Sequence, residues 1–247
     1  MAVNGCCVED WPLVHAIAAA HGEMVVANYG LHPWWVGRQP DHWLDLLRQR
    51  LLANPGAGLG EVSVFKAQLL LAQELQRPLS VRSLSGSSWH PSSHPPQVHC
   101  VRAVGHLREA LAEVRPTAPV LLHSWCGAAE DVRAIASAHP SAFFSVSGGI
   151  SALPPAKAIR TLRAIPADRL LLETDAPDGG LRLGPAWLEA LPGFARSAPP
   201  CPERQEPAGL RRMLALVAAA RGEGEVGLAA LTWRNACAVF AGLPAAR

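Results

Sequence analysis

Four side chains that can bind a metal ion follow short apolar runs of the sequence, and they are Glu61, His99, His123 and Asp175. Two imidazoles and two carboxylates form a donor set suited to Zn²⁺, Mn²⁺ or Mg²⁺. A single histidine after an apolar run is more often a hydrogen-bonded core residue than a ligand. Four donors in such positions are harder to explain by chance, so the set predicts a metal-assisted hydrolase.

The most informative stretch is Leu170-Leu-Leu-Glu-Thr-Asp-Ala-Pro-Asp178. Its three leucines are too few for a helix and predict a buried strand, and the residues from Ala176 onward predict a loop. An α/β barrel carries its catalytic groups at the carboxyl ends of such strands. The alternative is a strand whose last residues are acidic only because they meet water.

The rest of the chain alternates between strand-like and helix-like segments. This alternation predicts βαβ units and a parallel sheet, whose carboxyl edge would collect the four donors. Strands are expected at 2–4, 24–29, 57–61, 79–100, 120–123, 142–146 and 170–173, and helices at 11–21, 42–53, 63–75, 103–114, 129–139, 155–165, 206–220 and 226–240. A closed barrel of this type has eight strands. Seven are counted here, so we expect the first strand to be missing.

Composition places the chain among globular proteins. Its 247 residues are 49% hydrophobic and 17% charged, which predicts one domain over 1–247, and the net charge of +2 neither requires nor excludes a nucleic-acid ligand. The six cysteines lack zinc-site spacing and predict reduced thiols. No apolar run suits a membrane span and no signal peptide is visible. We therefore expect a cytoplasmic protein with no membrane association and no obligate protein partner.

Six motifs occur along the chain in a recognisable order: Gly30-Leu-His-Pro-Trp, Gly58-Leu-Gly-Glu61, Leu121-Leu-His-Ser, Phe144-Ser-Val-Ser-Gly148, Leu171-Leu-Glu-Thr-Asp-Ala-Pro-Asp178 and Trp233-Arg-Asn-Ala236. Together they resemble the TatD-related deoxyribonuclease family, most closely its plant-like branch. The resemblance runs from about Ala2 to Phe240, and its glutamate-threonine-aspartate element is highly specific.

The resemblance implies a distorted (β/α)₈ TIM barrel that hydrolyses phosphodiester bonds of DNA as a deoxyribonuclease or exonuclease. It also implies divalent metal cations (Mg²⁺, Mn²⁺ or Zn²⁺), up to two in the intact family and one here. The family's metal-ligand positions fall on Glu61, His99, His123 and Asp175. Asp175 would also orient or deprotonate the attacking water, whereas Glu173 would accept hydrogen bonds from backbone or arginine. His32 would lie near the substrate phosphate, unless His-Pro merely shapes a turn.

The chain departs from the family in ways that leave alternatives open. The family's first strand carries Asp-x-His-x-His, which does not occur here, and the family's long loop after Glu61 is replaced by Ser63-Val-Phe-Lys. One alternative is therefore a catalytically impaired or inactive TatD-like barrel. Another is a hydrolase of the amidohydrolase kind with a carbamylated lysine, but Lys66 and Lys157, the only lysines, both lie in predicted helices.

An insert interrupts the fourth strand. Residues 82–97 are rich in Pro and Ser without periodicity, which predicts a disordered loop. Deleting the 17 residues 81–97 joins Ser80 to Val98-His99-Cys100 and restores the family's Pro-Val-Ser-Val-His-Cys pattern. We hypothesise that these residues translate a retained intron, since Val-Arg can start on a GT donor and Gln97 can be a CAG acceptor.

Overall fold

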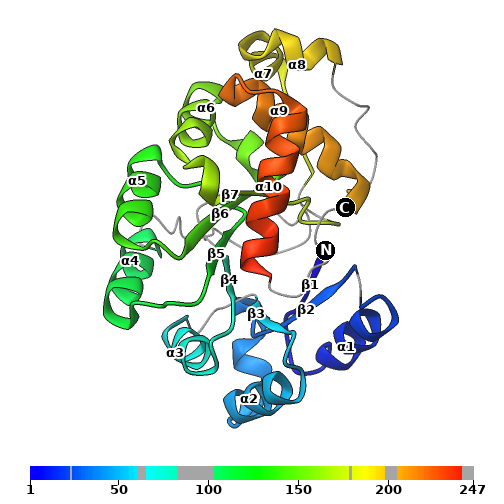
Figure 1. The fold of residues 1–247 in the computed structure, drawn as a ribbon, viewed down its shortest axis with the longest axis vertical. Coiled ribbons are helices and arrows are strands. Elements are labelled where there is room, and N and C mark those ends of the chain that lie inside the picture. Colours follow the sequence, from blue (N-terminus) through cyan, green and yellow to red (C-terminus); the bar gives the residue numbers. More distant parts are fainter. Residues whose placement is uncertain (23, 61–64, 83–102, 178–179, 198–204, 241–247) are drawn as a thin grey trace.

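Seven parallel strands form one sheet in which each strand pairs with the next along the chain (Figure 1). The computed structural model describes residues 1–22, 24–60, 65–82, 103–177, 180–197 and 205–240. The strands are β1 (Ala2–Gly5), β2 (Val26–Tyr29), β3 (Gly58–Gly60), β4 (Leu79–Arg82), β5 (Val120–His123), β6 (Ala142–Val146) and β7 (Leu170–Leu172). Because every pairing is parallel, all carboxyl ends lie at one edge of the sheet.

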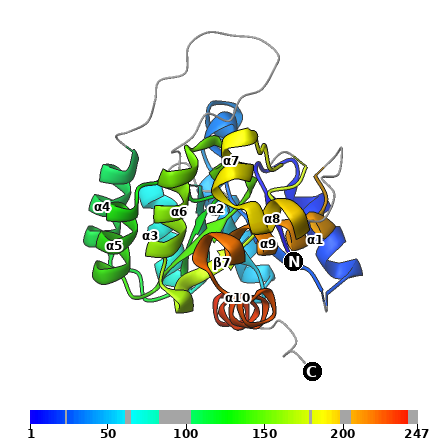
Figure 2. The same cartoon turned by 90° about the horizontal axis from the view of Figure 1, so that it is seen from above.

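Over the residues that the structure describes, the predicted fold class is confirmed as α/β, with a curled parallel sheet of seven strands, one fewer than a closed eight-stranded barrel. Within the described part of the chain, β1 and β7 are the outer strands and are not paired with each other. The view in Figure 2 shows helices α3 to α6 along one side of the sheet, with α10 beyond β7.

Helices fill the connections between the strands, and two helices make up most of the chain from Leu210 to Val239. Local signals start and stop them: Pro155 begins one helix, and Gly222, at a φ of 72°, ends another in the left-handed conformation. The helices are α1 (Trp11–Ala20), α2 (Trp43–Ala53), α3 (Phe65–Leu75), α4 (Ala103–Val114), α5 (Ala129–Ala138), α6 (Pro155–Ala164), α7 (Pro185–Ala190), α8 (Pro192–Ser197), α9 (Leu210–Arg221) and α10 (Glu225–Val239), with 3₁₀ turns η1 (Pro33–Arg38), η2 (Gly148–Ala152), η3 (Ala167–Arg169) and η4 (Pro207–Gly209). Sequence periodicity did not predict α7 and α8, because six residues span less than two helical turns.

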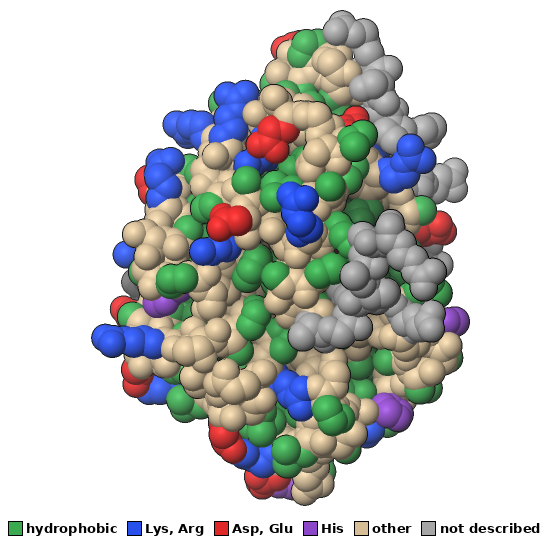
Figure 3. All heavy atoms as spheres, in the orientation of Figure 1, with side chains coloured by type: hydrophobic (Ala, Val, Ile, Leu, Met, Phe, Trp, Pro, Cys, Tyr) green, Lys and Arg blue, Asp and Glu red, His purple; other side chains and the backbone are tan. Residues whose placement is uncertain are grey.

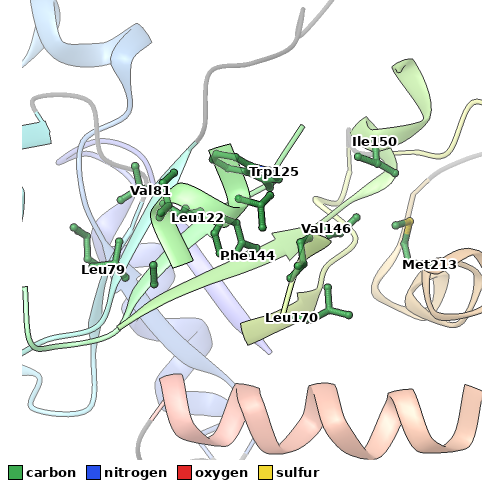
Figure 4. Close-up of a cluster of buried hydrophobic side chains, with 14 of the residues drawn as sticks. Leu79, Val81, Leu122, Trp125, Phe144, Val146, Ile150, Leu170 and Met213 are labelled. Carbon is green, nitrogen blue, oxygen red and sulfur yellow. The ribbon is translucent and has the colours of Figure 1, made fainter. Parts of the chain in front are cut away.

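Alternate residues of β4 to β7 pack beneath the helices as the main core. Leu122, Phe144, Val146 and Leu170 are completely buried, and Figure 4 shows them between Leu79 on one side and Met213 on the other. Trp125 meets Phe144 edge to face, with ring centroids 5.2 Å apart. This packing fixes which residues of each strand point to the opposite face.

Helix α10 packs against the opposite face of β5 and β7. Leu121 and Leu171 form a second apolar cluster with Val239 of α10. Asn235 on the same helix donates from Nδ2 to the carbonyl oxygens of Ala167 and Leu170, both at 2.8 Å. Helix α10 is thereby attached to the beginning of β7.

A close backbone contact joins the chain just after β2 to the end of β3. A Cβ added to Gly30 would lie 1.8 Å from the carbonyl oxygen of Gly60, so this position has no room for a side chain. The contact fixes the backbone two residues before His32 and immediately before Glu61.

Strand β4 includes the first two residues of the predicted insert. Val81 pairs with Leu122 and Arg82 pairs with His123, so a strand stands where a loop was predicted. The apolar Val81 continues the alternation begun at Leu79, which explains why the strand extends this far. The other insert residues, 83–97, lie outside the described residues.

Figure 3 shows Lys and Arg side chains scattered over the face that carries α10, between acidic and apolar side chains. Among the described helices, none combines the length and apolar character that crossing a bilayer requires.

We predict that Asn235→Ala lowers the free energy of unfolding by about 1–3 kcal/mol, because it removes the donor to the part-buried carbonyl contact of Ala167 and the buried one of Leu170. Urea unfolding followed by circular dichroism measures this change. The neighbouring exposed Arg234 supplies the control, since Arg234→Ala should change stability by less than about 0.5 kcal/mol. Equal effects of the two substitutions would show that the Asn235 hydrogen bonds do not hold α10 to β7.

Candidate functional site

Three adjacent strands present a polar side chain on the same face near their carboxyl ends. His123 closes β5, Ser145 lies in β6 and Glu173 follows β7 directly. The register places Leu121 beside Phe143 and Ser145 beside Leu171, and alternation along each strand then turns His123, Ser145 and Glu173 to the same face. His123 and Ser145 are buried, with 5% and 2% of their surface exposed.

Glu173 is the centre of the hydrogen bonding at this edge. Its Oε2 accepts from Ser145 Oγ at 2.6 Å and lies 2.7 Å from His123 Nδ1. Its Oε1 accepts from the backbone N–H of Ser124 at 2.7 Å. The backbone N–H of Glu173 donates to the Val146 carbonyl at 3.0 Å, which prolongs the pairing of β6 with β7 by one residue.

Asp175 lies on the other side of the His123 ring. Its Oδ1 is 3.4 Å from His123 Nε2, and 21% of its side chain is exposed. Asp175 reaches this place through a turn rather than through strand alternation, because its φ is 50° and β7 ends at Leu172. Aspartate tolerates this left-handed backbone better than most residues.

The charge state of His123 follows from its two acidic neighbours. Burial disfavours the imidazolium and by itself lowers the pKa of His123, but the carboxylates of Glu173 and Asp175 outweigh burial and raise that pKa well above its ordinary value. The ring can therefore carry a proton on the side of Asp175.

The same edge has donor chemistry that fits a divalent cation. Two ligands of a tetrahedral Zn²⁺, each about 2.0–2.2 Å from the ion, lie roughly 3.4 Å apart, and His123 Nε2 and Asp175 Oδ1 are separated by 3.4 Å. Within the described ranges, however, no three His, Cys, Asp or Glu residues are grouped closely enough to hold a metal. The described residues thus bring two suitable donors together.

The other predicted site residues are Glu61, His99 and His32, and the structure describes only the last of them. Glu61 and His99 lie outside the described residues. His32 is buried after β2, and its backbone N–H donates to the Cys6 carbonyl at 2.9 Å. At the carboxyl end of β4, the position beside His123 belongs to Arg82.

Sequence reasoning missed Ser145 and His123 as partners of Glu173. It predicted hydrogen bonds to Glu173 from backbone or arginine, and a backbone donor, the N–H of Ser124, is confirmed. A signal was present, since polar residues end three successive apolar strands, but only the register shows that they meet.

Comparisons with known proteins point to one family. The sequence model of the TatD related DNase family matches residues 91–241, more than half of the chain. The chain is 28% identical to the 3'-5' ssDNA/RNA exonuclease TatD of Erwinia tasmaniensis, over 91% of this chain and 82% of that protein. It is 34% identical to the enzyme of the same name from Erwinia amylovora, over 73% of this chain and 58% of that protein.

Solved structures show the same fold. The TatD homologue YJJV of Escherichia coli superposes with a TM-score of 0.71 at 22% identity, covering 98% of this chain and 86% of that one. A TatD family hydrolase of Entamoeba histolytica gives 0.71 at 14% identity, over 97% and 84%. The motifs, the parallel sheet and the family match therefore agree, and the chain belongs to the TatD-related DNase family.

Proposed function

We propose that this chain is a metal-dependent hydrolase that cleaves phosphodiester bonds of DNA. The observation that carries the proposal is the convergence of His123 Nε2 and Asp175 Oδ1, 3.4 Å apart at the carboxyl edge of the sheet. Family membership supports the reaction class, and the Erwinia relatives are named as exonucleases on single-stranded DNA and RNA.

The proposed ligands are His123 and Asp175, together with Glu61 and His99, and His32 is proposed to lie near the substrate phosphate. A divalent cation bound there would offset negative charge on the phosphoryl oxygens and lower the pKa of the attacking water. Asp175 would orient that water and accept its proton, since its carboxylate is partly exposed and lies beside His123 Nε2.

A second candidate function is that of a catalytically impaired member of the family. It is favoured by the sequence, in which the family's Asp-x-His-x-His motif does not occur. In that case the chain would bind metal weakly and turn over little or no DNA. Metal content and nuclease rate, measured on the same preparations, separate the two candidates.

We predict that His123→Ala lowers both the bound metal and the rate of phosphodiester cleavage, because it removes the imidazole donor. Elemental analysis after dialysis against Mn²⁺ or Zn²⁺ measures the first quantity, and release of nucleotides from single-stranded DNA measures the second. The exposed His106 of α4 is the matched control, and His106→Ala should change neither. Unchanged metal stoichiometry in the His123 variant would make that residue a core histidine.

We predict that Asp175→Asn lowers the cleavage rate by about 100-fold or more, as expected on loss of a general base. The substitution preserves the shape of the side chain but removes its negative charge. Asp168→Asn is the control, because the Asp168 side chain is 72% exposed and pairs only with Arg169 among the interactions described for it. A full rate with Asp175→Asn would remove Asp175 from the proposed chemistry.

The register of β4 suggests a third test, deletion of residues 81–97. Val98 would then take the place of Val81 beside Leu122, and His99 would take the place of Arg82 beside His123. We predict that this deletion raises metal content and cleavage rate above those of the full chain, because it replaces arginine by an imidazole at the strand position beside His123.

A control deletion of 83–99 removes the same number of residues and leaves Val81-Arg82 joined to Cys100. The two shortened chains then differ only in having His or Arg at one strand position. If both bind the same amount of metal, that position does not contribute a ligand.

A further inference from the structure

We propose that Glu173 is a positioning residue that fixes the ring orientation and tautomer of His123, with help from Ser145 and the backbone of Ser124. This proposal rests on the proposed function in one respect: the orientation matters because it directs Nε2 of His123 toward Asp175 and a cation.

The hydrogen-bond partners of Glu173 determine where the His123 proton lies. The backbone N–H of Ser124 can only donate, and it occupies Oε1; the hydroxyl of Ser145 donates to Oε2. An ionised carboxylate accepts and cannot donate. The contact of 2.7 Å between Oε2 and His123 Nδ1 therefore requires a proton on Nδ1. When His123 is neutral, its lone pair is then on Nε2, the atom that faces Asp175.

The surroundings hold this arrangement in place. Glu173 receives hydrogen bonds from two consecutive residues, the ring of His123 and the backbone of Ser124. Ser124 has a φ of 51°, a conformation that non-glycine residues rarely adopt and that persists where surrounding contacts enforce it. Ser124 Oγ also bonds Ser147 Oγ, and the Ser145 carbonyl accepts from the N–H of Trp125 at 2.8 Å. The loop after β5 is thus tied to β6 and to Glu173 together.

Glu173→Gln disturbs this arrangement in a way that can be worked out. The substitution keeps the size of the side chain but replaces one oxygen by an NH₂ donor. If the NH₂ group faces His123, Nδ1 must become the acceptor and the proton moves to Nε2. If it faces Ser124 instead, two donors oppose each other and a backbone N–H loses its partner. In either case the hydrogen bonds that orient the His123 ring are weakened.

The tautomer can be read directly from long-range ¹H–¹⁵N correlation spectra of the full chain. In the wild-type protein without metal, at alkaline pH above the pKa of His123, we expect Nδ1 to carry the proton. Glu173→Gln should move the proton to Nε2 or give a mixture of tautomers, and it should weaken Zn²⁺ binding about 10–100-fold. Ser145→Ala should keep the Nδ1–H tautomer, because the Ser124 and His123 contacts persist. Asp168→Asn controls for the loss of a carboxylate near the same strand.

A proton on Nε2 in the wild-type protein would overturn the proposal, and this reading needs no variant that might fail to fold. An unchanged tautomer together with unchanged Zn²⁺ affinity in Glu173→Gln would also overturn it. If the wild-type protein shows the Nδ1–H tautomer but binds no Zn²⁺, the proposed function fails while the positioning of His123 by Glu173 stands.

Discussion

The parallel register of β5, β6 and β7 is the constraint on which the candidate site depends. It sets His123, Ser145 and Glu173 side by side on one face, while Leu122, Phe144 and Leu170 turn to the other face and pack in the core. A shift of one residue in any strand would exchange the two faces and bury a polar side chain among the apolar ones. The large apolar residues of one face therefore fix the position of the polar residues on the other.

Electrostatic interactions then stabilise the charged side chains that the register brings together. A buried imidazolium between two carboxylates is stable only because each charge has partners, since an unpaired charge at this depth would be strongly disfavoured. Glu173 shares its negative charge among three donors from two neighbouring strands and a loop. Asp175 faces Nε2 on the other side of the ring and is exposed to a similar extent, 21% of its side chain against 18% for Glu173. Two carboxylates only two residues apart thus have distinct surroundings, and surroundings of this kind separate a positioning group from a reacting one.

Much of the fold was predictable because its signals are local. The predicted segments 120–123, 142–146 and 103–114 coincide with β5, β6 and α4, where apolar runs end at clear breaks. His123 and Asp175 were also predicted, and the structure places them together. The side-chain partners of Glu173, Ser145 and His123, were not predicted, because a hydrogen bond between residues far apart in sequence depends on the register. The end of β4 was missed for a similar reason: Arg82 reads as part of a polar segment, but pairing with β5 extends the strand through it.

The contact between Gly30 and the carbonyl of Gly60 has a consequence for how this protein can vary. Because even a methyl group at Gly30 would overlap the backbone of β3, the chain just after β2 and the end of β3 meet without any adaptable side chain between them. A change of path in one segment must be matched in the other. If the sequence after β2 were exchanged for that of a relative, by evolution or by grafting, the sequence around the end of β3 would have to be exchanged with it. His32 and Glu61 would then be replaced together.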